Sequence, residues 1–292
     1  MSDKNKALQS LIINSPFEAP AQHWEQAAAG KGLVLQQGRR PAGYELYDTR
    51  NNTRRVVPLN MVNQIRTRVD DWRAAGYIGV TSITRQLLEH WHARGEWVPE
   101  ETRWVGGPRQ NPFYFCQLEA IETLIWWVEG SAEFKQGINV PGDGGAWERL
   151  CNKMATGSGK TALMGMIITW QTLNAISYPK DGRFSRAIFI VAPGLTVKSR
   201  LQTLNPGDEK NVYDQFNLCP NEALRTRLNQ AELLIENWHT LMPLKNQERS
   251  VVKKGKESDE AFTRRVLGKL AAYKDLVVIN DEAHHAYRQR AE

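Results

Sequence analysis

The sequence predicts an α/β fold in which a parallel β-sheet is sandwiched between helices. Four strand–loop–helix units follow one another along the second half of the chain, an order typical of this fold class. Residues 187–191 and 276–280 are continuously apolar, as in strands that a parallel sheet buries on both faces. A glycine-rich loop at residues 153–161 leads into a predicted helix. These observations place a ligand site at the carboxyl ends of the strands.

The region before this domain, residues 1–110, is predicted to be a smaller accessory region that is mainly helical. Its first 57 residues are interpreted as irregular or weakly β, and the basic pair Arg39 and Arg40 as a solvated turn or a phosphate contact. Two helices follow, one capped by Asn60 and one beginning after Thr81 or Ser82. Their apolar faces repeat at helical spacing and consist of Met61, Val62, Ile65, Val69 and Trp72, then Ile83, Leu87, Leu88 and Trp91.

The second domain is predicted to span residues 111–292, after a linker that contains Gly106-Gly107-Pro108. Its predicted helices occupy residues 113–128, 161–173, 223–230 and 259–272, and a further helix is capped by Thr196. Its predicted strands occupy residues 147–154, 187–191, 233–235 and 276–280. Residues 204–219 are expected to form a loop, and the charged run 245–260 a solvated insertion.

The composition is that of a globular chain with enough apolar residues for sizeable cores. A formal net charge of +6 permits a polyanionic partner such as nucleic acid but does not require one. The cysteines, Cys116, Cys151 and Cys219, are widely spaced, which fits neither a disulfide framework nor a zinc site. No stretch has the pattern of a signal peptide or the length of a membrane span. We therefore expect a cytoplasmic protein with no membrane association.

The loop at residues 153–161 has the composition of a phosphate-binding loop. Its glycines allow tight wrapping, so that backbone amides point at phosphate oxygens, while Lys160 supplies charge to the β- and γ-phosphates and Thr161 a ligand to Mg²⁺. The strict pattern has glycine where this chain has Met154, so the prediction depends on its context. The candidate nucleotide-binding residues of the loop are Thr156, Gly157, Ser158, Gly159, Lys160 and Thr161.

Two further sites complete the predicted chemistry. Asp281 and Glu282 directly follow the last predicted strand, where Asp281 would hold Mg²⁺ and Glu282 would orient or deprotonate the attacking water. Gln117 lies beside aromatic residues about 40 positions before the loop, where a glutamine can read the edge of adenine. The sequence therefore predicts ATP and Mg²⁺ as ligands, with Lys160, Asp281 and Glu282 as the catalytic residues.

Several motifs carry a resemblance to a known family. Met154-Ala-Thr-Gly-Ser-Gly-Lys-Thr161 and Asp281-Glu-Ala-His284 are similar to the nucleotide motifs of superfamily 2 DEAD/DEAH-box helicases, whose branch commonly carries methionine at the position of Met154. Together with Val191-Ala-Pro-Gly-Leu195, Asn237-Trp-His239 and residues 115–123, they resemble the Res subunit of type III restriction enzymes. A resemblance through residues 16–20, 23–24 and 39–43 extends it to the N-terminal part.

The resemblance implies a RecA-like P-loop domain that is the first ATP-binding lobe of a DNA helicase or translocase. In such a lobe His284 would couple the nucleotide to a second lobe, and loops after two strands would contact the backbone of duplex DNA without reading bases. The DNA-contact residues by this resemblance are Pro193, Gly194, Thr196, Asn237 and His239. Core packing is an equal alternative for Trp238 and His239. A modification methyltransferase subunit is a partner that the resemblance raises and the sequence does not decide.

Only eight residues follow His284. We therefore expect the chain to lack a second lobe with its arginine finger, as a fragment, a truncated product or half of a split enzyme. Such a chain is expected to bind ATP and Mg²⁺ but to hydrolyse ATP slowly. Two other functions stay open at this point, a P-loop ATPase switch unrelated to helicases and a DNA-binding module with a vestigial nucleotide site.

Overall fold

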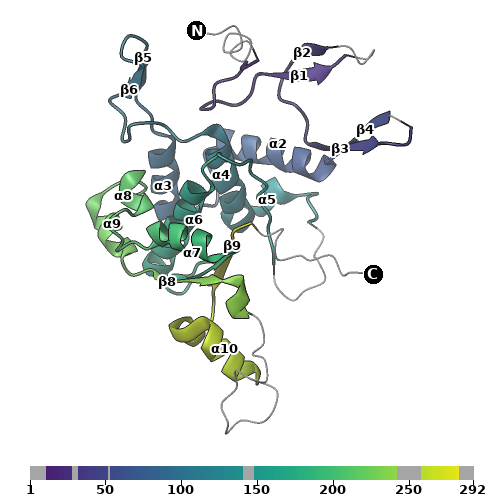
Figure 1. The fold of residues 1–292 in the computed structure, drawn as a ribbon. Helices are drawn as coiled ribbons and strands as arrows, with labels where there is room; N and C mark the ends of the chain where they lie inside the picture. Colours follow the sequence, from purple (N-terminus) through teal and green to yellow (C-terminus); the bar gives the residue numbers. More distant parts are fainter. Residues whose placement is uncertain (1–10, 28–31, 52, 141–147, 242–257, 283–292) are drawn as a thin grey trace. The chain divides into compact units, whose positions relative to one another are not determined.

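The computed structural model describes residues 11–27, 32–51, 53–140, 148–241 and 258–282 (Figure 1). The chain divides into two compact units. The first contains Met1–Val80, Glu96–Val105 and Gln110–Ser158, and the second contains Thr81–Gly95, Gly106–Arg109 and Gly159–Glu292. No helix within the described ranges has the length and apolar character needed to cross a bilayer. The predicted boundary at residue 110 stays a prediction.

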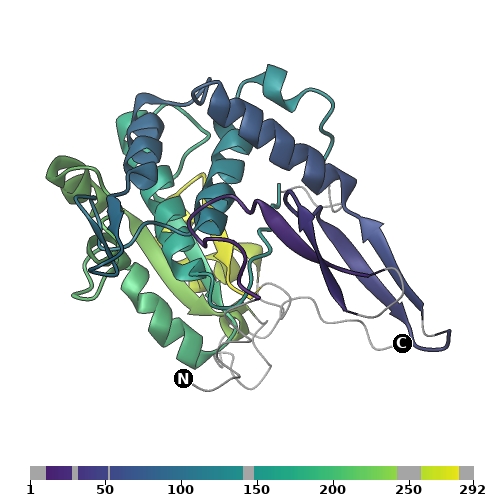
Figure 2. The same ribbon diagram turned by 90° about the horizontal axis from the view of Figure 1, so that it is seen from above.

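The first unit combines antiparallel hairpins with two long helices. Its hairpins pair β1 (Gln22–Gln26) with β2 (Leu33–Gln37), β3 (Gly43–Asp48) with β4 (Thr53–Pro58), and β5 (Glu96–Val98) with β6 (Arg103–Val105). Its helices are α2 (Asn60–Ala74), α4 (Phe115–Glu129) and α5 (Ala132–Lys135), and α2 packs against α4 and α5. Figure 2 shows the β1–β2 and β3–β4 hairpins side by side. The prediction of a mainly helical N-terminal region is therefore wrong.

Turn chemistry explains the β3–β4 hairpin. The carboxylate of Asp48 accepts hydrogen bonds from the backbone N–H groups of Arg50 and Asn51, at 2.9 and 3.4 Å, and from the side chain of Asn51. An aspartate that bonds the backbone two residues on stabilises a tight turn. The flanking tyrosine, leucine and valine residues favour extended backbone. Together these features outweigh the Gly, Gln and Pro content that made this segment read as irregular.

An ion-pair network stabilises the helical part of the first unit. Glu122, whose side chain is 1% exposed, accepts from Arg73 Nε and Nη2 at 2.8 and 2.6 Å and from the Tyr77 hydroxyl at 2.7 Å. Arg39 forms a bidentate pair with Glu119 and lies over the Phe115 ring. Arg39 is thus neither a solvated turn residue nor a phosphate contact in this structure, because its charge is paired with α4.

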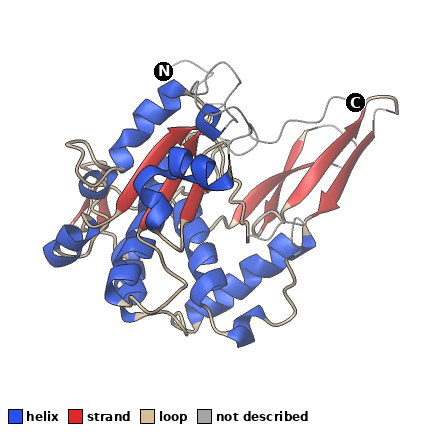
Figure 3. Ribbon diagram, turned by 90° about the horizontal axis from the view of Figure 1, so that it is seen from below, coloured by secondary structure: helices blue, strands red, loops and turns tan. Residues whose placement is uncertain are grey.

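The second unit is built on a three-stranded parallel sheet with the order β8–β7–β9. The strands are β7 (Ala187–Ala192), β8 (Glu232–Asn237) and β9 (Val277–Asn280). All six residues of the central strand β7 are buried, as its apolar sequence predicts. Helices lie on both faces of the sheet (Figure 3). The α/β class and its parallel sheet are confirmed.

The helices of this unit surround the sheet in chain order. They are α3 (Ser82–His92), α6 (Lys160–Ser177), α7 (Leu195–Arg200), α8 (Val212–Gln215), α9 (Glu222–Leu228) and α10 (Asp259–Leu267). Short 3-10 turns are η1 (Leu201–Leu204), η2 (Trp238–Leu241) and η4 (Gly268–Ala272). One face of β7 packs on Val266 and Leu270. Helix α6 packs against α3, α8 and α9, so its apolar residues are buried around most of its surface.

The strand predicted at residues 147–154 is not formed in its described part, residues 148–154. Glu148 and Arg149 are exposed, and Leu150 is 42% exposed. The Trp127 indole N–H donates to the carboxylate of Glu148, which holds this segment to α4. A central strand of a parallel sheet needs an apolar run that this segment lacks. The described sheet is therefore one strand smaller than predicted.

Smaller differences concern helix ends. Leu59, not Asn60, precedes the first turn of α2, and Gly194, not Thr196, is the N-cap of α7. Residues 204–219, expected to be a loop, include η1's last residue and α8. The cap of α3 is confirmed, since the Thr81 hydroxyl accepts from the Thr84 N–H at 3.0 Å. The predicted insertion at 245–260 lies almost entirely outside the described residues.

Candidate nucleotide-binding site

The glycines of the loop give it its shape. Gly157 and Gly159 have φ angles of 80° and 78°, in the left-handed region that other residues seldom adopt. Gly159 is the N-cap of α6, and its carbonyl accepts from the N–H groups of Ala162 and Leu163 at 3.0 and 3.3 Å. A side chain at Gly157 would meet no other atom within 4 Å, so the space beside this glycine is open to a ligand. The loop thus ends on the positive end of an 18-residue helix.

Lys160 and Glu282 form the contact that joins the loop to the sheet. Lys160 is the first residue of α6, and its Nζ donates to Glu282 Oε1 at 2.7 Å. The two side chains are 31% and 34% exposed. Glu282 follows β9 by two positions and has a φ of 53°, which turns the chain away from the strand. Two predicted catalytic residues that are 122 positions apart are therefore neighbours.

Asp281 lies at the end of β9 beside this pair. Its backbone N–H donates to the Val191 carbonyl at 3.0 Å, which extends the β9–β7 pairing by one residue. Burial raises the pKa of the half-buried Asp281 carboxyl, the adjacent Glu282 raises it further, and Lys160 and Arg200 act in the opposite direction. A cation bound next to Asp281 would relieve this unfavourable charge.

The donor set suits a hard divalent cation that also binds phosphate. Within the described residues no group of three or more His, Cys, Asp or Glu side chains gathers into a metal site. Mg²⁺ does not need such a group, because it keeps several waters and is bound by one or two protein oxygens plus phosphate oxygens. The half-buried Thr161 hydroxyl and the Asp281 carboxylate are oxygen ligands of this kind. The residues present therefore fit Mg²⁺ bound together with a nucleotide.

The predicted DNA-contact loops follow adjacent strands at one edge of the sheet. Ala192 and Asn237 are register partners at the ends of β7 and β8. Thr196 and His239 are exposed, Pro193 and Gly194 are partly exposed, and Asn237 is buried and accepts from the His239 N–H at 3.1 Å. Trp238 packs against the core beneath β7, which favours core packing for this residue. His284 lies outside the described residues.

Lys198 and Glu236 connect these two loops, and the sequence analysis did not select them. Lys198 Nζ donates to Glu236 Oε2 at 2.7 Å, and the Thr240 hydroxyl donates to the same oxygen at 3.3 Å. The pair ties α7, which follows one loop, to the end of β8, which precedes the other. The only signal in the sequence was the position of each residue within three of a predicted contact residue.

Gln117 belongs to the first unit, where it caps α4. Its Oε1 accepts from the Tyr114 N–H at 2.9 Å, and its side chain is buried, so the residue forms half of a capping box. This is the structural role of a glutamine at the third position of a helix. Its predicted role in reading adenine stays a prediction.

The sheet, the glycine-rich loop closing on α6 and the Asp-Glu pair after β9 define a nucleotide-binding α/β protein. The family model for the type III restriction enzyme, res subunit, matches residues 112–292, and the chain therefore belongs to this family. The family domain is helicase-like and related to helicase superfamily 2. The predicted resemblance is thus confirmed. Searches of curated proteins and of solved structures found no significant match.

Proposed function

We propose that the chain is the ATP-binding lobe of a DNA helicase or translocase of the Res type, RecA-like in its P-loop architecture. The observation that supports this most directly is the 2.7 Å contact between Lys160 of the loop and Glu282 after β9. The pair brings a phosphate-binding cation and a water-activating carboxylate within one hydrogen bond of each other. This is the spacing that nucleotide hydrolysis needs once a phosphate group lies between them.

In this proposal each residue of the site has one task. The amides from Thr156 to Thr161 bind phosphate oxygens at the start of α6, and Lys160 moves from Glu282 to the terminal phosphates. Thr161 and Asp281 hold Mg²⁺, which supplies Lewis-acid polarisation of the phosphoryl oxygens when bound. Glu282, released from Lys160, orients the attacking water. Gln117 reads the adenine edge.

The same proposal assigns the DNA backbone to the loops after β7 and β8. Thr196 and His239 are exposed, so both have access to phosphate groups. Asn237 acts through the backbone of His239, to which it is bonded. Because contacts of this kind do not read bases, binding should be independent of sequence.

Slow turnover by residues 1–292 is also part of the proposal. The resemblance implies that the motor hydrolyses ATP between two lobes, with an arginine from the second, and such an arginine contributes about 10³ to 10⁵ in rate. Brisk DNA-stimulated hydrolysis by the 292-residue chain would contradict this part. Hydrolysis that ignores DNA would instead favour a P-loop switch unrelated to helicases.

Titration with a fluorescent ATP analogue in the presence of Mg²⁺ tests the site. Lys160→Ala removes a charge-assisted contact, so affinity should fall about tenfold or more. Lys210→Ala is the matched control, since Lys210 is exposed and its side chain lies outside the loop. Full affinity in Lys160→Ala would refute the site, and no affinity in the unaltered chain would favour a vestigial nucleotide site.

A further inference from the structure

The β3–β4 hairpin of the first unit is a sheet without a covering layer. Every residue of β3 is exposed, including Tyr44 at 54%, Leu46 at 55% and Tyr47 at 61%. Val56 of β4 is 55% exposed. A two-stranded hairpin with no packed face is at most marginally stable in water. A surface of this kind is best explained by a binding partner.

Both acidic residues of the hairpin are engaged within the first unit. Glu45 is paired with Arg40 and with Arg54, and Arg54 also donates to Gln26 of β1. Asp48 is occupied by the turn bonds described above. Residues 39–58 contain five arginines against these two acids, so the segment has an excess of positive charge.

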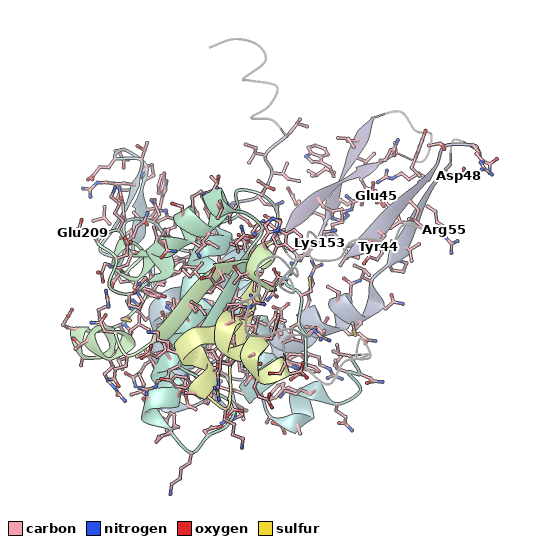
Figure 4. The ribbon with its side chains drawn as sticks, turned by 60° about the horizontal axis from the view of Figure 1, so that its bottom comes forward. Tyr44, Glu45, Asp48, Arg55, Lys153 and Glu209 are labelled. Atoms are coloured by element: carbon pink, nitrogen blue, oxygen red, sulfur yellow. The ribbon has the colours of Figure 1, made fainter. Side chains whose placement is uncertain are left out.

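The excess charge resides on Arg50 and Arg55. Neither side chain has an ion-pair partner among the residues that the structure describes, and both are exposed. The register places Arg55 directly opposite Leu46 and Val57 opposite Tyr44, so Arg55, Leu46 and Tyr44 share one face. Figure 4 shows Tyr44 and Arg55 on the same side of the hairpin. This face offers a cation, a phenol and an apolar side chain together.

We propose that the β3–β4 hairpin is a contact surface for the backbone of duplex DNA. The guanidinium groups of Arg50 and Arg55 bind phosphate oxygens, while Tyr44 and Leu46 contact the sugars between them. The inference rests on the proposed function for the choice of DNA, and it adds a site outside the nucleotide-binding unit.

The charge argues for DNA against an apolar protein partner. A dry protein interface over this face would bury Arg55 without a carboxylate, which is costly. A DNA interface supplies one phosphate after another and stays hydrated, so that the guanidinium keeps part of its solvation.

Fluorescence anisotropy with a labelled duplex of about 30 base pairs, at several salt concentrations, tests this surface. The Arg50→Ala/Arg55→Ala double variant of the full chain should bind about tenfold more weakly at moderate salt and show a salt slope shallower by about 2. Arg55→Lys should keep the slope of the unaltered chain, because it keeps the charge. Arg103→Ala, on the β5–β6 hairpin, removes one charge from an exposed arginine paired with Glu101 and should change little.

The outcomes separate the two proposals. If the unaltered chain binds duplex but the double variant shows the same slope and affinity, the hairpin proposal is wrong and the proposed function stands. If the unaltered chain binds the ATP analogue but no duplex, both the hairpin surface and the DNA part of the proposed function are wrong. Retained affinity for the ATP analogue in the double variant shows that a loss of DNA binding is not caused by misfolding.

Discussion

The Lys160–Glu282 pair makes a quantitative prediction about nucleotide affinity. A phosphate group has to displace Glu282 from Lys160, so part of the binding energy is consumed in breaking the pair. Glu282→Gln keeps the size and the hydrogen-bonding oxygen of the side chain but removes its charge. We expect this variant to bind ATP more tightly while losing hydrolysis, because water activation needs the carboxylate.

The size of the effect follows from the exposure of the two groups. Both side chains are about a third exposed, at 31% and 34%, so solvent screens the pair despite the 2.7 Å separation. A pair of this kind contributes about 0.5 to 1 kcal/mol. Since a factor of ten in affinity is about 1.4 kcal/mol, Glu282→Gln should tighten binding roughly two- to fivefold.

Equilibrium titration with a slowly hydrolysed ATP analogue measures this difference, with Mg²⁺ and ionic strength held constant. Glu209→Gln is the control, because Glu209 is exposed and the substitution makes the same change in net charge. An unchanged or weaker affinity in Glu282→Gln, with the control also unchanged, would refute the idea that the pair competes with phosphate.

Two further predictions concern stability. The pKa of Asp281 is raised by burial, so the native state binds this proton more readily than the unfolded chain, and the contribution of Asp281 to stability falls as pH rises through that raised pKa. Asp281→Asn should therefore increase the melting temperature at pH 8 more than at pH 4 and weaken Mg²⁺-dependent nucleotide binding; equal shifts at both pH values would contradict the assignment. Glu122→Ala should lower the free energy of unfolding by about 2 to 4 kcal/mol, because it leaves Arg73 without its buried partner while Arg73 keeps 27% exposure. Urea unfolding measures this loss, and Asp70→Ala, which removes the exposed partner of the same arginine, should cost under about 1 kcal/mol.

Elements with strong local signals were predictable from the sequence. Helix α3 has a capping threonine at its start and a regular apolar face, and the structure confirms both. Strand β7 has six buried residues in succession, and that run is visible in the sequence as a buried parallel strand. In these elements local propensity and burial favour the same structure.

The N-terminal hairpins were not predictable in the same way. Strand β2 has five exposed residues, with apolar and polar groups in two blocks instead of in alternation. Alternation is the signal that identifies a strand with one buried face, and a hairpin without a packed face does not produce it. The decisive contacts are also between distant residues, such as Arg54 with Gln26 and Arg39 with Glu119.

The missing strand before the loop does not affect the part of the site within the second unit. Its geometry depends on β7, β9 and the start of α6, since Asp281 pairs with Val191 and Glu282 contacts Lys160. The sequence identified the lysine and the two acids by their motifs. It did not reveal that the lysine is paired with the acid it should assist, because such a pairing depends on how the chain turns after β9, where Glu282 adopts a positive φ. Ligand-free binding residues that neutralise each other keep opposite charges close together without leaving either unpaired, and a phosphate group that enters exchanges one anion on Lys160 for another.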